Sequence, residues 1–293
     1  MSPESFYAGS VRAGLEELER TAFAMVEAGA ALIDVGARST APYRDSAVTE
    51  DEEARRLGAA VERLAAKLPV AVSADTCRPG PARVALEAGA RVLNDVSGLH
   101  DSAVARLVVS HGASVILMAS PSGIGAGGPS STTVSTTVDG RSDRAEPSKP
   151  LEATGLGRPP HPDADPVATI RTILTLCLQR ARAAGIPEDR IVLDPGIGFF
   201  LEAPEARAAW DVTVLARLNE LTALGRPLAV GLSRKSFIGA LTGQASPEGR
   251  LAGSLAATAV AVLQGAALVR THDVADTRAA VVVADRLRKA GAR

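Results

Sequence analysis

The sequence predicts a (β/α)8 barrel of the TIM type, folded as a single domain over residues 1–293. Three observations support this fold class. Short apolar runs alternate with longer amphipathic stretches, a pattern typical of a parallel sheet covered by helices. Nearly the same Gly-Ala phrase recurs at four helix–strand junctions, which indicates a repeating βα unit. The length is also suitable, because such a barrel uses about 250 residues as one domain.

Seven short runs are nearly all apolar, as expected for the buried strands of a parallel sheet. These expected strands are 31–35, 70–74, 91–93, 114–118, 191–193, 228–231 and 268–270. Amphipathic stretches between them predict helices, among them 52–67, 80–88, 169–184 and 249–264. At the repeated junctions a glycine follows the helical stretch, which suits the left-handed position that ends a helix. These glycines are Gly29, Gly89, Gly112 and Gly265.

The segment from about 119 to 166 interrupts this alternation. It is rich in Gly, Ser, Thr and Pro and has almost no large apolar residue, so it predicts a long flexible loop. Because the loop follows a strand, it is expected to project from the face of the barrel where active sites lie. A linker between two domains is the alternative, but the βα pattern resumes in register after residue 166.

Composition limits the partners and the compartment. The formal net charge is −1 and no basic stripe occurs, which argues against nucleic acid and membrane-surface partners. Two cysteines, Cys77 and Cys177, cannot build a disulfide framework or a cysteine-based zinc site. Neither a signal sequence nor a membrane-spanning apolar run is evident, so a cytoplasmic protein is expected.

Polar residues follow six of the seven apolar runs. They are Asp34, Asp75, Thr76, Asn94, Asp95, Asp194, Ser233, Arg234, Lys235, Arg270, His272 and Asp273. A lone Asp at a strand end often only caps the next helix. Capping does not explain Lys235, Arg270 or His272, because cations oppose the dipole at a helix N-terminus. A closed sheet would bring these groups together at one mouth.

The residue types at this mouth suggest a ligand. Asp and Asn pair with the amino and ring N–H groups of a flat heterocycle, whereas Arg stacks on a ring or binds phosphate in a forked geometry. The sequence has no nucleophile elbow, Walker loop or H-E-x-x-H motif. It therefore predicts a site for a planar polar ring beside an anion.

With these residues the sequence resembles the dihydropteroate synthases. The matching phrases occur in family order along nearly the whole chain: Ser2-Pro3-Glu4-Ser5-Phe6, Ile33-Asp34-Val35-Gly36 with Ser39-Thr40, Ala74-Asp75-Thr76, Asn94-Asp95-Val96-Ser97-Gly98, Asp194-Pro195-Gly196-Ile197-Gly198-Phe199, Ser233-Arg234-Lys235-Ser236-Phe237-Ile238-Gly239 and Arg270-Thr271-His272-Asp273-Val274. Members of archaeal type are more similar around Gly36–Tyr43. The resemblance implies condensation of 6-hydroxymethyl-7,8-dihydropterin diphosphate with 4-aminobenzoate, giving dihydropteroate and diphosphate for folate synthesis.

The resemblance also implies roles for individual residues. The pterin would be bound by Asp75, Asn94, Val96, Asp194, Lys235 and Arg270. The aminobenzoate would lie beside Thr40, Phe199 and Ser236, and the diphosphate beside Arg270 and His272. Lys235, Arg270 and His272 would be the catalytic residues. Diphosphate would leave first, and the aromatic amine would attack the resulting methylene cation. Mg²⁺ as cofactor, ligands unspecified, and a homodimer are further expectations from the family.

Several positions depart from the family pattern. The family's first strand and its Asn normally precede the Ser2–Phe6 phrase, so the first barrel strand is expected to be missing from this chain. A start codon assigned too late is the favoured explanation, and an incomplete barrel the other. Ala41 replaces the usual Arg, Leu201 replaces a common Lys, and Met118-Ala119-Ser120 replaces a Met-His-Met phrase.

Two other functions stay open. A pterin-dependent methyltransferase shares the barrel and the pterin pocket, but it has no diphosphate to expel, so the cations at positions 235 and 270 disfavour it. An inactive paralogue that binds a pterin without turnover would explain the missing strand together with Ala41 and Leu201.

Overall fold

The computed structural model describes residues 14–38, 48–121 and 164–291. Seven strands alternate with helices along this part of the chain. The strands are β1 (Leu32–Gly36), β2 (Ala71–Asp75), β3 (Val92–Asp95), β4 (Ser114–Met118), β5 (Ile191–Asp194), β6 (Leu228–Gly231) and β7 (Ala266–Arg270). The helices are α1 (Leu15–Glu27), α2 (Glu50–Ala65), α3 (Pro79–Glu87), α4 (Ser102–Ser110), α5 (Pro166–Ala184), α6 (Pro204–Ala216), α7 (Ser236–Thr242), α8 (Leu251–Leu263) and α9 (Val274–Gly291). Short 3-10 turns are η4 (Glu188–Arg190), η5 (Leu218–Leu224) and η6 (Pro247–Arg250).

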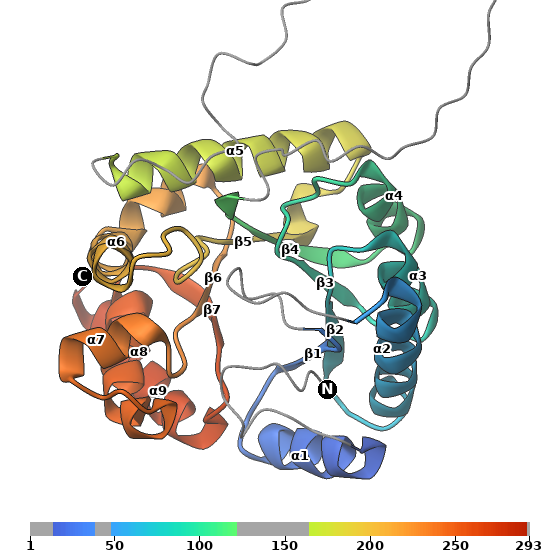
Figure 1. Cartoon of the computed structure of the whole chain (residues 1–293), viewed down its shortest axis with the longest axis horizontal. Helices are drawn as coiled ribbons and strands as arrows, with labels where there is room; N and C mark the ends of the chain where they lie inside the picture. Colours follow the sequence, from blue (N-terminus) through green and yellow to red (C-terminus); the bar gives the residue numbers. More distant parts are fainter. Residues whose placement is uncertain (1–13, 39–47, 122–163, 292–293) are drawn as a thin grey trace, which may run out of the picture.

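All seven strands form one parallel sheet in the order β1-β2-β3-β4-β5-β6-β7. The sheet curls, and the helices form a ring around it (Figure 1). Within the described ranges no ladder joins β7 to β1. Their ends nevertheless approach each other, because Arg270 Nε on β7 donates to Asp34 Oδ2 on β1 at 2.7 Å. The predicted barrel with seven strands is therefore confirmed, and each expected strand lies within two residues of an observed one.

Aliphatic side chains fill the space between the sheet and the helices. The largest fully buried ones are Leu57, Leu64, Leu93, Leu99, Leu117, Ile170, Ile173, Leu174, Ile191, Leu193, Ile197 and Leu218. This composition follows from a sequence with only 3% aromatic residues. One aromatic pair lies near β5, where Phe200 stacks on Trp210 at 5.3 Å between ring centroids.

The helix ends follow local sequence rules. Asp101 accepts from the backbone N–H of Ala103 at 2.8 Å and so caps α4. Asp165 caps α5 just before Pro166, a residue that suits the first turn. All four junction glycines have positive φ, from 60° at Gly112 to 107° at Gly89. The glycine prediction is therefore confirmed at each junction.

The expected long loop falls mostly on residues 122–163, which lie outside the described residues. Its first two residues are buried. Ala119 N–H donates to the Asp194 carbonyl oxygen at 2.8 Å, and Ser120 Oγ donates to the Val96 carbonyl oxygen at 2.8 Å. Residues 119 and 120 therefore belong to the packed barrel rather than to a flexible segment. In the described ranges, none of the helices has the length and apolar character to span a membrane.

Candidate active site

The polar strand ends meet at one mouth of the curled sheet, as predicted. Because all strands run parallel, the ends of β1, β2, β3, β5 and β7 point the same way. They supply Asp34, Asp75, Asn94, Asp194 and Arg270. Asp34 is a predicted strand end outside the predicted pterin set, yet it contacts two members of that set, Asn94 and Arg270.

Arg270 connects both edges of the sheet across this mouth. Its Nε donates to Asp34 Oδ2 at 2.7 Å and its Nη2 donates to Asp75 Oδ2 at 2.9 Å. Asn94 Nδ2 donates to the same Asp34 oxygen at 3.1 Å. The Arg270 side chain is 57% exposed, whereas that of Asp75 is 6% exposed. The guanidinium thus lies above the carboxylates, between them and solvent.

Two carboxylate oxygens at the mouth lack a hydrogen-bond partner among the described residues. They are Asp34 Oδ1 and Asp75 Oδ1, and both are buried. Burial raises the pKa of Asp75 to about 7, and the nearby Arg270 charge opposes this rise. A buried acceptor without a donor is costly, by about 1–3 kcal/mol. A ligand with N–H donors on a flat edge would satisfy both atoms.

The loop after β5 supplies a second part of the site. Asp194 Oδ1 accepts from Gly196 N–H at 2.8 Å, and burial raises the pKa of Asp194. Lys235, at the N-cap of α7, donates to the Ile197 carbonyl oxygen. Burial lowers the pKa of Lys235, while the Asp194 charge opposes this change. The Lys235 ammonium lies 4.9 Å from the centre of the Phe199 ring.

His272 lies beside the loop after β6. Its Nδ1 is 3.0 Å from Ser233 Oγ. Burial and the charge of Arg270 lower the pKa of His272 to about 4, so the imidazole is neutral at neutral pH. Toward an anion it would therefore act as a hydrogen-bond donor. This differs from the cationic role that the sequence suggested.

Arg234, one of the predicted polar strand ends, pairs with Asp273 next to His272. Its Nη2 and Nε donate to Asp273 Oδ1 and Oδ2 at 2.7 and 2.9 Å. The residue is buried and has φ +56°, a conformation unusual for a side chain other than glycine. This pair fixes the loop that carries His272, so Arg234 and Asp273 are structural.

A buried carboxylate also joins the ends of β1 and β2. Glu53 on α2 accepts from Thr76 Oγ1 at 2.6 Å and from Arg78 Nη1 at 3.1 Å, and its Oε2 lies 3.3 Å from Arg38 Nε. Arg78 also donates to the Val48 carbonyl oxygen at 3.1 Å. Residues 38 and 48 flank the segment 39–47 and are thus bound to one Glu53–Arg78 pair.

The other predicted residues have different surroundings. Thr40 and Ala41 lie outside the described residues. Phe199 and Val96 are half-buried, and Ser236 is exposed in the first turn of α7. Leu201 is buried in the core, at 7% exposure, so no donor replaces the family's Lys there.

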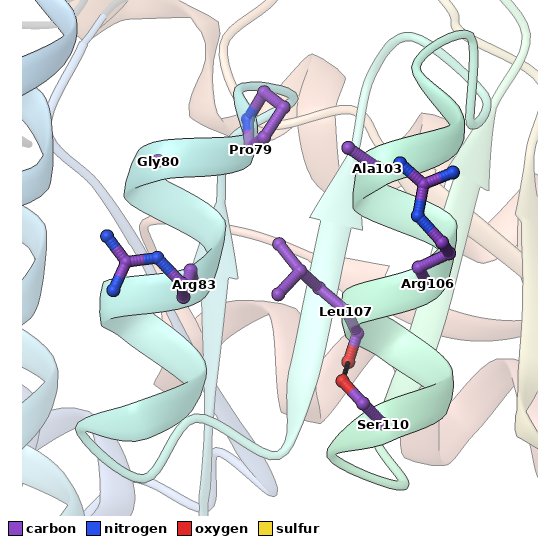
Figure 2. A pocket seen from close by; sticks show the side chains of 7 residues that line it. All are labelled: Pro79, Gly80, Arg83, Ala103, Arg106, Leu107 and Ser110. Atoms are coloured by element: carbon purple, nitrogen blue, oxygen red, sulfur yellow. Dashed lines mark hydrogen bonds between the residues drawn. The ribbon is translucent and has the colours of Figure 1, made fainter.

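The described part of the chain holds no cluster of three or more His, Cys, Asp or Glu residues suited to a metal ion. A groove of about 370 Å³ lies on the outer surface between α3 and α4 (Figure 2). Arg83, Arg106 and Leu107 contribute to its walls, and none of the mouth residues lines it. The groove is therefore separate from the candidate site.

Fold and site together define an enzyme of the TIM-barrel class whose candidate substrate site lies at the C-terminal ends of the strands. The chain matches the family of pterin-binding enzymes over residues 1–272. It belongs to this family, which confirms the resemblance inferred from the sequence phrases.

Individual relatives agree with this assignment. A probable bifunctional folylpolyglutamate synthase/dihydropteroate synthase of Haloferax volcanii is 36% identical over 97% of this chain, which spans 29% of that longer protein. The dihydropteroate synthase of Synechocystis is 33% identical, covering 98% of this chain and 87% of the relative. The structure of Xanthomonas albilineans dihydropteroate synthase with 4-aminobenzoic acid has a TM-score of 0.78 and 34% identity, covering 98% of this chain and 90% of that one.

Proposed function

We propose that this chain is a dihydropteroate synthase, which joins 6-hydroxymethyl-7,8-dihydropterin diphosphate to 4-aminobenzoate and releases diphosphate. The observation that carries the proposal is the pair of buried, unpartnered acceptors Asp34 Oδ1 and Asp75 Oδ1 beside Asn94. A pterin edge presents amino and ring N–H donors, and these would satisfy such acceptors. The relatives reported above support the same reaction.

In this proposal Asp34, Asp75, Asn94, Asp194 and Lys235 bind the pterin edge, and the half-exposed Arg270 packs against the ring. Arg270 and His272 contact the diphosphate, the guanidinium as a cation and the neutral imidazole through an N–H. Val96 borders the pterin, whereas Thr40, Phe199 and Ser236 border the aminobenzoate.

The reaction needs no nucleophile from the protein. The bond between the pterin methylene carbon and the diphosphate oxygen breaks, and both electrons leave with the diphosphate. The amine nitrogen of 4-aminobenzoate then forms a bond to the methylene carbon and loses a proton. The protein contributes orientation of the two rings and stabilisation of the charge on the leaving group.

Magnesium enters this proposal only with the diphosphate. The described residues offer no cluster that would hold the ion alone. Mg²⁺ typically keeps several waters and binds substrate phosphates with one or two protein oxygens. Addition of EDTA tests this part. We expect it to abolish binding of diphosphate but not binding of the pterin.

We also propose a cytoplasmic homodimer. Its support is a set of exposed apolar side chains on the neighbouring helices α8 and α9, namely Val260, Leu263, Val282, Val283 and Leu287. Several exposed apolar side chains on two helices that contact each other favour an interaction surface. Light scattering during size-exclusion chromatography would measure the mass, and a monomer at micromolar concentration would contradict this part.

The decisive experiment measures diphosphate release from the pterin diphosphate with and without 4-aminobenzoate in the presence of Mg²⁺. Release that requires the amine, together with formation of dihydropteroate, is the expected result. Binding of the pterin without amine-dependent release would favour the inactive paralogue.

A further inference from the structure

A buried carboxylate lies behind the candidate site, on the helix that follows β5. Asp211 on α6 is 0% exposed. Its Oδ1 accepts from Gly198 N–H at 2.8 Å, and its Oδ2 is buried without a hydrogen-bond partner among the described residues. None of the roles proposed above uses this side chain, and its burial prevents direct contact with a substrate at the mouth.

Gly198 separates Asp211 from Lys235. The glycine has φ +87°, and a Cβ atom placed on it would lie 3.2 Å from Lys235 Cδ and 3.3 Å from Nζ. Its N–H points to Asp211 and its Cα side contacts Lys235. The carboxylate and the Lys235 side chain therefore both adjoin one loop residue, and the ammonium is also bound to the Ile197 carbonyl oxygen.

We propose that Asp211 is a positioning residue with two tasks: it fixes the loop at Gly198, and it supplies the buried counter-charge that keeps Lys235 protonated. This inference rests on the proposed function, because Lys235 is assigned there to the pterin edge.

The electrostatic surroundings support this division of tasks. Burial lowers the pKa of Lys235, and the carboxylates of Asp194 and Asp211 oppose that effect, whereas Arg270 adds to it. Burial raises the pKa of Asp211 to about 6, opposed by the Gly198 hydrogen bond and then by Lys235 and Arg207. Above pH 6 Asp211 is therefore mostly ionised and acts electrostatically on the half-buried Lys235 ammonium.

The Asp194 carboxylate is not directed to Lys235 alone. In the proposed complex its carboxylate also accepts hydrogen bonds from the pterin. Arg207 also lowers the pKa of Asp211, while its Nε donates to the Leu201 carbonyl oxygen at 2.5 Å. Asp211 is fully buried, so a ligand at the mouth would not contact it and its charge would continue to act on Lys235.

The test compares Asp211→Asn with Asp211→Glu. Asn retains an acceptor for Gly198 N–H but lacks the charge. Glu retains the charge, but its side chain is longer by one methylene group. Affinity for 6-hydroxymethyl-7,8-dihydropterin would be measured by calorimetry between pH 6 and pH 10, so the readout does not require turnover. The ionisation of the pterin itself is common to all variants.

In Asp211→Asn we expect the alkaline decrease in pterin affinity to begin about one pH unit lower than in the wild type, because loss of a nearby charge lowers the pKa of Lys235. In Asp211→Glu the alkaline decrease in pterin affinity (the alkaline limb) should begin at the same pH as in the wild type, while the thermal midpoint of unfolding falls. Asp95→Asn is the matched control. It neutralises another buried carboxylate that accepts backbone N–H groups, at Ser97 and Leu99, and should not move the limb.

The fluorescence of Trp210, the only tryptophan, reports whether the loop keeps its packing, since its ring stacks on Phe200. An unchanged alkaline limb in a folded Asp211→Asn protein would overturn the proposal, as would an equal shift in Asp95→Asn. If Asp211→Asn does not fold, the test rests on Asp211→Glu. A shift of its alkaline limb by a full pH unit would then overturn the proposal. Absence of pterin binding in the wild type would refute the proposed function and this inference with it, whereas an unchanged pH dependence in a protein that binds the pterin would refute this inference alone.

Discussion

Replacement of Arg270 should lower the free energy of unfolding by an amount that depends on pH. Burial raises the pKa of Asp75 to about 7, well above its unfolded value near 3.8. The stability linked to this carboxyl is therefore fully present below about pH 4 and is lost as the pH rises through 7. Above pH 7 the charged Asp75 depends on the 2.9 Å hydrogen bond from Arg270.

In Arg270→Gln the pKa of Asp75 should rise further. Breaking a fully buried ion pair costs about 3–5 kcal/mol. The cost here is smaller, because the guanidinium is 57% exposed and Asp75 can accept a proton instead. We therefore expect the free energy of unfolding to fall by about 1–2 kcal/mol at pH 8. At pH 5.5, where Asp75 is protonated in both proteins, the difference should be smaller, because mainly the hydrogen bond from Arg270 to Asp34 is then lost.

Urea unfolding followed by circular dichroism at both pH values would measure this difference. Arg288→Gln is a suitable control, because Arg288 pairs with Asp285 on the surface and Asp285 also contacts Lys289. Its effect should stay below about 0.5 kcal/mol at either pH. A loss in Arg270→Gln that is equally large at pH 5.5 and pH 8 would refute the role assigned to Asp75.

Three further outcomes are expected. Asp194→Ala should abolish detectable pterin binding in calorimetry, because it leaves donors of a desolvated ring unpaired, whereas intact binding would remove Asp194 from the site. His272→Ala should weaken binding of the pterin diphosphate more than binding of the pterin alcohol, and equal losses of affinity would contradict the assignment of His272 to the anion. Gly196→Ala should lower the thermal midpoint strongly, since its Cβ would lie 1.9 Å from a backbone oxygen at φ +70°. Gly225→Ala has a similar φ of +71° but open space, so it should cost only about 1 kcal/mol; equal effects of the two would show that crowding is unimportant.

The sequence predicted the strands well because each is a short, nearly continuous apolar run. β7 begins two residues before the expected 268, since Ala266 and Ala267 carry little apolar signal. Helices such as α4 and α9 were not specified, although α9 is the last element of the barrel. Its exposed Val282 and Val283 blur the amphipathic pattern.

At the site, the sequence located the polar strand ends but could not assign their partners. In the sequence Asp34 is one of several candidate helix caps. Its contact with Arg270 joins residues 236 positions apart, and such a distant contact is not evident from the sequence. Arg234 and Asp273 resemble site residues in sequence, yet they bind each other. Asp211 lies inside a helical stretch, where an acidic residue usually indicates a solvent-facing position. Only the packing of α6 against the loop after β5 reveals its burial.

The attachment of residues 38 and 48 to Glu53 and Arg78 has a consequence for divergence within the family. Both anchors belong to α2 and to the end of β2, outside the segment that they flank. Replacements between these two points leave both attachments intact. Ala41, which stands where relatives usually have Arg, is such a replacement. Nine consecutive positions (39–47) can therefore vary between members of the family without removing either attachment to the barrel.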